Sequence, residues 1–142
     1  MDNINDIGNY SRCHDYKYYK TLLNTERYLR LEIPLKYKIA FAKFRYSSHK
    51  LNIELGRHSN TPQNERLCVF CLNQSNVAVI DCEYHAFFHC PKFNIIRRQY
   101  LFNWYSSGNN INEFYSLMAS ENDDTILKLT MYIYNLLNMI NM

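Results

Sequence analysis

Residues 66–91 read RLCVFCLNQSNVAVIDCEYHAFFHCP and hold four of the chain's five cysteines and two of its five histidines. Two residues separate Cys68 from Cys71, a spacing at which a tight turn directs both sulfur atoms at one metal ion. A second Cys/His cluster follows at zinc-site range and offers the remaining ligands: Cys82, His85, His89 and Cys90. The pattern predicts a closed zinc site, which stabilises a fold rather than catalysing a reaction.

The second half of the ligand set has two solutions. His85 with Cys90 leaves four intervening residues, which can form one helical turn. Cys82 with His85 leaves two intervening residues, like the first pair, and makes Cys90 a buried thiol. His89 is a weaker choice; it lies four residues after His85 and shares its face if this stretch is helical.

The chain between the ligands is expected to form a small hairpin. LCVFCL is short and apolar, NQSN is a turn signal, and VAVI is typical of a returning strand. A segment of this size has almost no core, so the free energy of metal binding becomes free energy of folding. We therefore predict a zinc-stabilised β-hairpin, or knuckle, over residues 66–91.

Helical patterns flank the knuckle on both sides. Apolar residues recur at spacings near three and four from about Asp15 to Leu31. A second helix is expected to begin at Pro34, with Gly56 as a stop signal. Beyond the knuckle, helices are expected over residues 92–105, residues 111–119 and the stretch from an Asn122 N-cap to Asn141.

The length and composition suit one small domain. The chain has 142 residues, of which nearly half are apolar, and only three glycines and three prolines. Few turn-forming residues argue against a many-stranded sandwich or barrel. The prediction is a mainly α domain over residues 12–142, with the knuckle inserted in its middle and residues 1–11 as a flexible N-terminus.

Signals for export and membrane insertion are not expected in this sequence. No apolar run follows a basic start, and the longest apolar stretch, Leu127 to Ile140, is interrupted by polar residues. An odd, clustered set of cysteines without a secretory signal is typical of metal ligands in a reducing compartment. We therefore expect an intracellular protein, in the nucleus or the cytoplasm, without a membrane partner.

Positive charge is concentrated in the middle of the chain. Residues 34–66 contain seven Lys and Arg against two Glu, although the net charge of the whole chain is only +3. Such a segment favours a polyanionic partner, and the alternative is a solvated helix face. Lys36, Lys43 and Lys50 recur every seven residues, which places them on one face of a helix.

Several blocks of the sequence together resemble a known zinc-binding segment. ERLCVFC, DCEYHAFFHCPKFN and IIRRQYLF are similar to a segment towards the carboxyl end of LINE-type (non-LTR) retrotransposon reverse transcriptases and of short derivatives of them. The family's pattern falls on Cys68, Cys71, Asp81, Glu83, His85, Cys90, Pro91, Arg97 and Arg98. An upstream lead-in falls on Lys43, Phe44, Arg45, Ser47, His49, Leu51, Ile53, Glu54, Gly56 and Arg57.

This resemblance covers about residues 15–105 and implies both a ligand set and a role. It favours His85 with Cys90 as the second ligand pair, and Cys82 departs from the family by standing where an acidic residue is usual. It implies handling of element RNA or target DNA beside a polymerase. It implies no catalysis here, since the chain has no aromatic-x-Asp-Asp strand to bind polymerase metal ions.

The sequence therefore predicts a zinc-stabilised nucleic-acid-binding module that is not itself an enzyme and is a fragment or derivative of such an element. The residues expected to meet phosphates of RNA or DNA are Lys36, Lys43, Arg45, Lys50, Arg57, Arg66, Lys92, Arg97 and Arg98. One alternative is a protein–protein interaction module that docks through the apolar last helix, on a polymerase or another protein. The other is a decayed mobile-element remnant.

Overall fold

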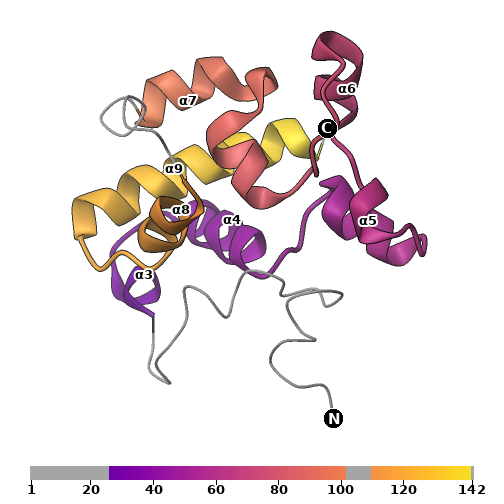
Figure 1. Ribbon diagram of the computed structural model, residues 1–142. Helices are drawn as coiled ribbons and strands as arrows, with labels where there is room; N and C mark the ends of the chain where they lie inside the picture. The colour runs from indigo at the N-terminus through magenta and orange to yellow at the C-terminus, as the bar shows by residue number, and fades with distance from the viewer. Residues whose placement is uncertain (1–25, 102–109, 142) are drawn as a thin grey trace.

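The structure is a computed structural model that describes residues 26–101 and 110–141 (Figure 1). These residues form helices joined by short connections, and the described ranges contain no strand. The helices are α3 (Arg27–Arg30), α4 (Leu35–Arg45), α5 (Asn52–His58), α6 (Val69–Ser75), α7 (Asn94–Leu101), α8 (Ile111–Met118) and α9 (Asp123–Ile140). The predicted mainly α fold is confirmed.

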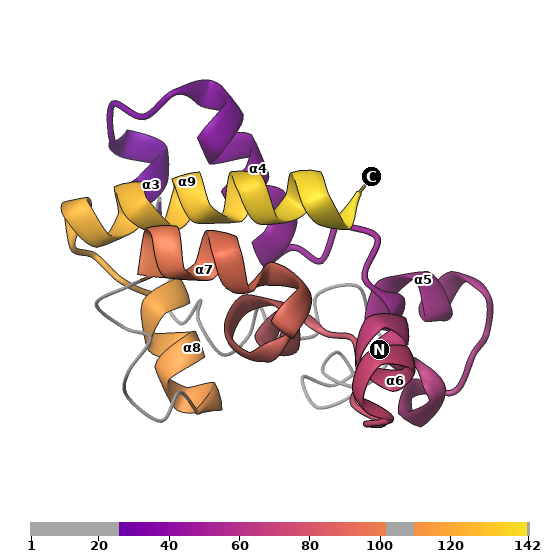
Figure 2. The same ribbon diagram turned by 90° about the horizontal axis from the view of Figure 1, so that it is seen from above.

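Helix α9 forms the centre of the core. The Asn122 side chain caps it by accepting a hydrogen bond from the Thr125 N–H at 3.0 Å, as the sequence predicted. Figure 2 shows α9 lying between α4 and α7, against which it packs. Its apolar side chains are buried there: Ile126, Leu129, Tyr132, Ile133, Leu136 and Leu137. The domain itself therefore buries most of the apolar side chains of this helix.

Helix α4 begins directly after Pro34, as expected, and ends at Arg45, earlier than the apolar pattern suggested. Ser47, two residues later, has a positive φ of 59°, which turns the chain out of the helix. Phe44 is fully buried, and its ring lies 6.3 Å from Phe87 and 6.4 Å from Phe114. This aromatic cluster joins α4 to the segment that carries His85.

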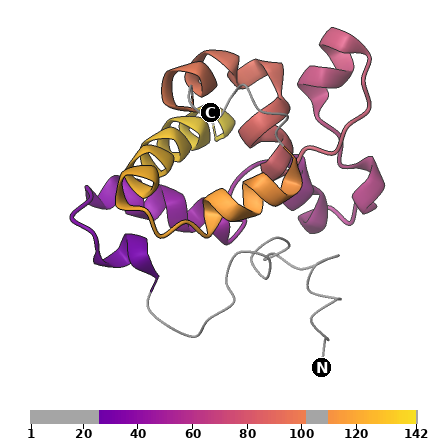
Figure 3. The ribbon, with the colours of Figure 1, turned by 60° about the vertical axis from the view of Figure 1, so that its left-hand side comes forward.

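The predicted hairpin is corrected by the structure. Residues 69–75 form helix α6, because the Leu72 N–H donates to the Cys68 carbonyl at 3.1 Å and the chain turns at once. Asn76 ends α6 in the left-handed conformation with φ of 51°. The returning chain makes only one isolated antiparallel bridge, between Leu67 and Ile80. Figure 3 shows α5 and α6 together on one side of the molecule, away from α9.

Gly56 lies inside α5 instead of ending a helix, so the predicted stop is wrong. Its role is to make room, since a Cβ atom at this position would lie 2.5 Å from Cγ of Arg66. The Arg66 side chain is buried and donates to the carbonyls of Thr61 and Ile53, both at 2.9 Å. The glycine therefore serves the packing of α5 against the chain that enters the knuckle.

The substitution Gly56→Ala is expected to destabilise the domain by about 1–3 kcal/mol. In a solvent-exposed helix the same change would stabilise the protein by about 1 kcal/mol, because alanine has the higher helix propensity. Here the new methyl group displaces Arg66, whose hydrogen bonds hold it in place. Urea unfolding measures the difference in the free energy of unfolding, and a more stable alanine variant would contradict the packing role.

The remaining helix predictions are met in part. The helix expected over 15–31 is described only from Arg27 to Arg30, and residues 1–11 lie outside the described ranges. The helix expected over 92–105 begins at Asn94, after a 3₁₀ turn at Pro91–Phe93, and is described as far as Leu101. Helix α8 matches its prediction closely. Within the described ranges, none of the helices combines the length and apolarity that a membrane span requires.

Candidate metal centre

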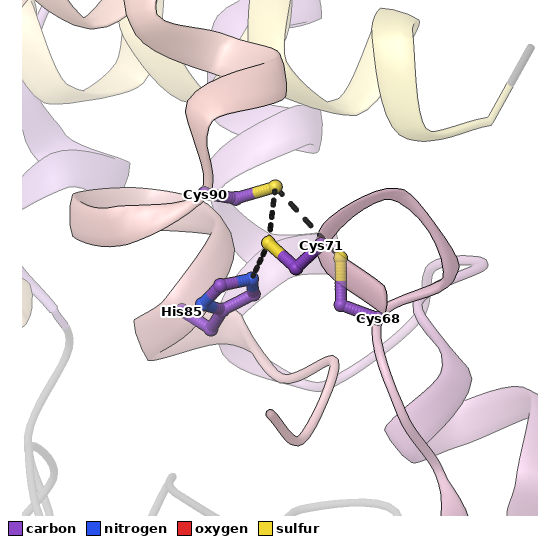
Figure 4. Close-up of side chains that lie close together, drawn as sticks. All are labelled: Cys68, Cys71, His85 and Cys90. Atoms are coloured by element: carbon purple, nitrogen blue, oxygen red, sulfur yellow. Dashed lines mark hydrogen bonds between the residues drawn. The ribbon is translucent and has the colours of Figure 1, made fainter. Parts of the chain in front are cut away.

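Four side chains from the knuckle converge on one point in the interior of the molecule (Figure 4). The Sγ atom of Cys90 lies 3.8 Å from that of Cys68 and 3.9 Å from that of Cys71. The Sγ atom of Cys71 lies 3.4 Å from Nε2 of His85. All four ligand atoms lie within 4.8 Å of one another, and all four residues are buried. The cluster is close enough to hold a metal ion.

Each half of the cluster is set by a local turn. Cys68 precedes α6 and Cys71 lies in its first turn, so the start of one short helix presents both sulfur atoms. His85–His89 form a π-helical turn, closed by a hydrogen bond of 2.8 Å from the Cys90 N–H to the His85 carbonyl. This wider turn, bonded between residues five apart, brings His85 and Cys90 to one side.

The structure separates the two ligand sets that the sequence left open. Cys82 is half-buried and lies outside the cluster. His89 is exposed, and its Nε2 lies 2.9 Å from the Tyr84 hydroxyl. Among the residues that the structure describes, the cluster therefore consists of Cys68, Cys71, His85 and Cys90.

The cluster without a metal ion holds a neutral imidazole and protonated thiols. Burial, and then the charges of His89 and Arg97, lower the pKa of His85 to about 4, so its imidazole is neutral at pH 7. Burial raises the pKa of Cys71 and raises that of Cys90 to about 12. The described cysteines form no disulfide, and sulfur atoms 3.8 Å apart are far beyond the ~2.05 Å of such a bond. Binding of a cation would displace the thiol protons.

Arg97 holds the turn that carries His85 and Cys90. Its guanidinium is almost completely buried and donates to the carbonyls of Phe87 at 3.0 Å and of Ala86 and Cys90 at 2.9 Å. The Tyr132 hydroxyl of α9 also donates to the Phe87 carbonyl, at 2.7 Å. The ligand turn is thereby fixed to both α7 and α9.

Two acidic residues fasten the knuckle to the lead-in segment. Glu83 is buried, and its Oε1 lies 2.8 Å from the Ser47 hydroxyl and 2.7 Å from Nε2 of His49. The Leu51 N–H donates to Nδ1 of His49, which assigns the ring proton to Nε2. This bond makes the ring a donor to the carboxylate.

Asp81 makes the second connection between these segments. Its Oδ2 accepts from the Asn52 N–H at 2.8 Å, and its carbonyl accepts from the Ile53 N–H at 3.0 Å. The lead-in segment and the block DCEYHAFFHCPKFN are therefore in contact through these bonds. Sequence reasoning assigned no contacts to these residues, and the signal for them was their place in the resemblance, which includes Ser47, His49, Asp81 and Glu83.

Three of the predicted nucleic-acid contacts are corrected, because their side chains are buried and bonded to protein. Arg45 forms an ion pair of 2.8 Å with Glu26, and Arg66 and Arg97 donate to the backbone carbonyls named above. Arg57 is half-buried and donates to Oε1 of Glu54 at 2.6 Å. The remaining members of the predicted set are exposed: Lys36, Lys43, Lys50, Lys92 and Arg98.

The similarity to LINE-type reverse transcriptases rests on the quoted sequence blocks alone and stays a prediction. Comparison of the chain with protein-family models, with curated proteins and with solved structures finds no match.

Proposed function

We propose that the protein is a zinc-stabilised nucleic-acid-binding module. The observation that carries the metal part is the spacing of the ligand atoms. A tetrahedral zinc with Zn–S bonds of about 2.3 Å separates its sulfur ligands by about 3.8 Å, and a sulfur from a nitrogen ligand by about 3.5 Å. The distances of 3.8, 3.9 and 3.4 Å in the cluster agree with this geometry.

Zinc at this position has a structural role. Three thiolates and one imidazole fill the four positions of a closed site, and a closed site is the kind that stabilises folds. The ion would join α6 to the π-helical turn, two segments connected otherwise by one isolated bridge and a few backbone hydrogen bonds. Neutral His85 binds through Nε2, the nitrogen that faces Cys71.

The nucleic-acid part is supported by the positive charge on α4 and on the segment that follows it. The sequence of α4 contains no acidic residue, and α9 contains acidic residues only in its first turn. Lys36 and Lys43 are exposed on α4, and Lys50 is exposed in the segment that follows. A face of this kind attracts phosphates without selecting a base sequence. We infer that the chain is a fragment or stand-alone derivative of a retroelement protein, in keeping with the sequence blocks.

Replacing Lys36, Lys43 and Lys50 all by glutamine is expected to flatten the slope of log K against log salt concentration by roughly two to three units. Each phosphate contact contributes ~0.7 to this slope on single strands and ~0.9 on duplex. Fluorescence anisotropy over a series of salt concentrations measures the slope. Lys128→Gln, a change at another exposed lysine, is the control and should leave the slope nearly unchanged. Binding that does not respond to salt, or no binding at low salt, would contradict the proposed function.

A further inference from the structure

We propose that the outer face of the α4–α9 pair binds single-stranded nucleic acid, with a base stacked on the aromatic pair Tyr37 and Tyr134. The inference rests on the proposed function and adds the form of the strand and the means of recognition. Tyr37 belongs to α4 and Tyr134 to α9, and both are half-buried. Their ring centroids lie 5.2 Å apart in an edge-to-face arrangement, with 74° between the planes.

A lysine stands directly over this pair. The Nζ atom of Lys36 lies 5.2 Å from the centroid of each ring. A cation–π contact at an exposed site is weak, whereas a base stacked on an aromatic ring is held more strongly. The flexible Lys36 side chain can move from the rings to a phosphate, which leaves the ring faces to the base. The cluster therefore supplies both an aromatic face for a base and a positive charge for a phosphate.

Polar residues continue from the aromatic pair along the same helix face. Asn138 and Asn141 follow Tyr134 by four and seven residues and are exposed. The Asn141 Oδ1 accepts a hydrogen bond of 3.2 Å from the Lys50 N–H, so Lys50 lies at the far end of this face. Seven residues of helix span about 10 Å. A strand that stacks at Tyr134 can thus reach Lys50 along Asn138.

The face that runs from Tyr134 to Lys50 ends beside the candidate metal centre. Lys50 and Lys92 both line a pocket of about 120 Å³, whose wall includes Cys68 and Cys90. Asp81 also lines this pocket, but its Oδ2 already accepts the Asn52 N–H. Lysines at the mouth give a strand a second set of phosphate contacts after Lys36. Zinc would hold this end of the face in place by fixing Cys68 and Cys90.

Stacking distinguishes single strands from duplex. The base faces of a duplex are covered by neighbouring pairs, and only an unpaired base offers a face to a tyrosine. The lysines attract the phosphates of both forms. Loss of the aromatic ring is therefore expected to weaken binding of single strands alone.

The test compares Tyr134→Leu with Tyr134→Phe in the full, zinc-loaded chain. The probes are a labelled oligothymidylate of about 12 nucleotides and a duplex of the same length. Leucine keeps the apolar packing but removes the ring, and it is expected to weaken oligothymidylate binding about tenfold while duplex binding changes less than about twofold. Phenylalanine keeps the ring and should retain binding of both probes. Tyr100→Leu, at a half-buried tyrosine of α7, is the matched control and should change neither.

The outcomes separate this inference from the proposed function. An equal loss on both probes in Tyr134→Leu, or no loss on either, overturns the stacking site. If the lysine variants still flatten the salt dependence in that case, the nucleic-acid-binding function stands without it. If neither probe binds at low salt, the proposed function falls and the stacking site falls with it. A thermal melt of each variant confirms that the domain is folded before binding is compared.

Discussion

The substitution Cys90→Ser should abolish tight zinc binding and unfold the knuckle. Cys90 is the sulfur that lies within 3.9 Å of both other cysteine ligands, so its loss opens the closed site at its centre. A structural zinc supplies about 10 kcal/mol or more of folding free energy, which is comparable to the whole stability of a typical domain. Metal analysis of the purified variant should find no retained zinc, and circular dichroism should show lost helix content.

Cys82→Ser is the matched control for this experiment. Cys82 is a half-buried cysteine of the same segment that lies outside the cluster. Its replacement should retain one zinc per chain and change the free energy of unfolding by less than about 1 kcal/mol. The reverse result, with zinc lost in Cys82→Ser and kept in Cys90→Ser, would overturn the ligand assignment while leaving a zinc site in place. A chelator added to the wild-type protein should reproduce the effect of Cys90→Ser.

The parts of the fold that local chemistry decides could be predicted from the sequence. Asn122 caps α9 because an asparagine oxygen accepts the N–H of a residue three positions on, whatever surrounds it. The first ligand pair was visible for the same reason, since its two-residue spacing is itself the geometry of the turn. The second pair needed more. The π-helical turn that joins His85 to Cys90 has no sequence signature, and only the resemblance favoured these residues.

The errors arise where tertiary contacts override local preference. Val69 and Phe70 favour a strand, yet they lie in α6, where the turn places Cys68 and Cys71 together. Gly56 is typical of a helix end, yet it lies within α5, where the Arg66 side chain occupies the space of a Cβ atom. Charge was the least reliable guide. A buried and an exposed arginine have the same sequence symbol, and burial follows only from the packing of distant segments.

Arg97 and Arg98 show this limit most clearly, and they allow a decisive comparison. Both were expected to meet phosphates, but Arg97 is 1% exposed and Arg98 is exposed. They are adjacent in α7, so their side chains leave the helix in different directions. The first lies against the ligand turn, and the second is directed away from the core.

Arg97→Met should therefore destabilise the domain by about 3–5 kcal/mol, because the buried carbonyls of Ala86 and Cys90 lose their guanidinium donor. Because these carbonyls hold the turn between two ligands, zinc affinity should also fall about 10- to 100-fold, as measured by competition with a chelator. Arg97→Lys keeps the charge but lacks the planar guanidinium that donates to the carbonyls of Ala86, Phe87 and Cys90 at once. It should therefore recover little of the lost stability or zinc affinity. Arg98→Met should leave stability and zinc affinity nearly unchanged. Equal effects at the two positions would show that charge on α7, and not the bonds to the ligand turn, stabilises the centre.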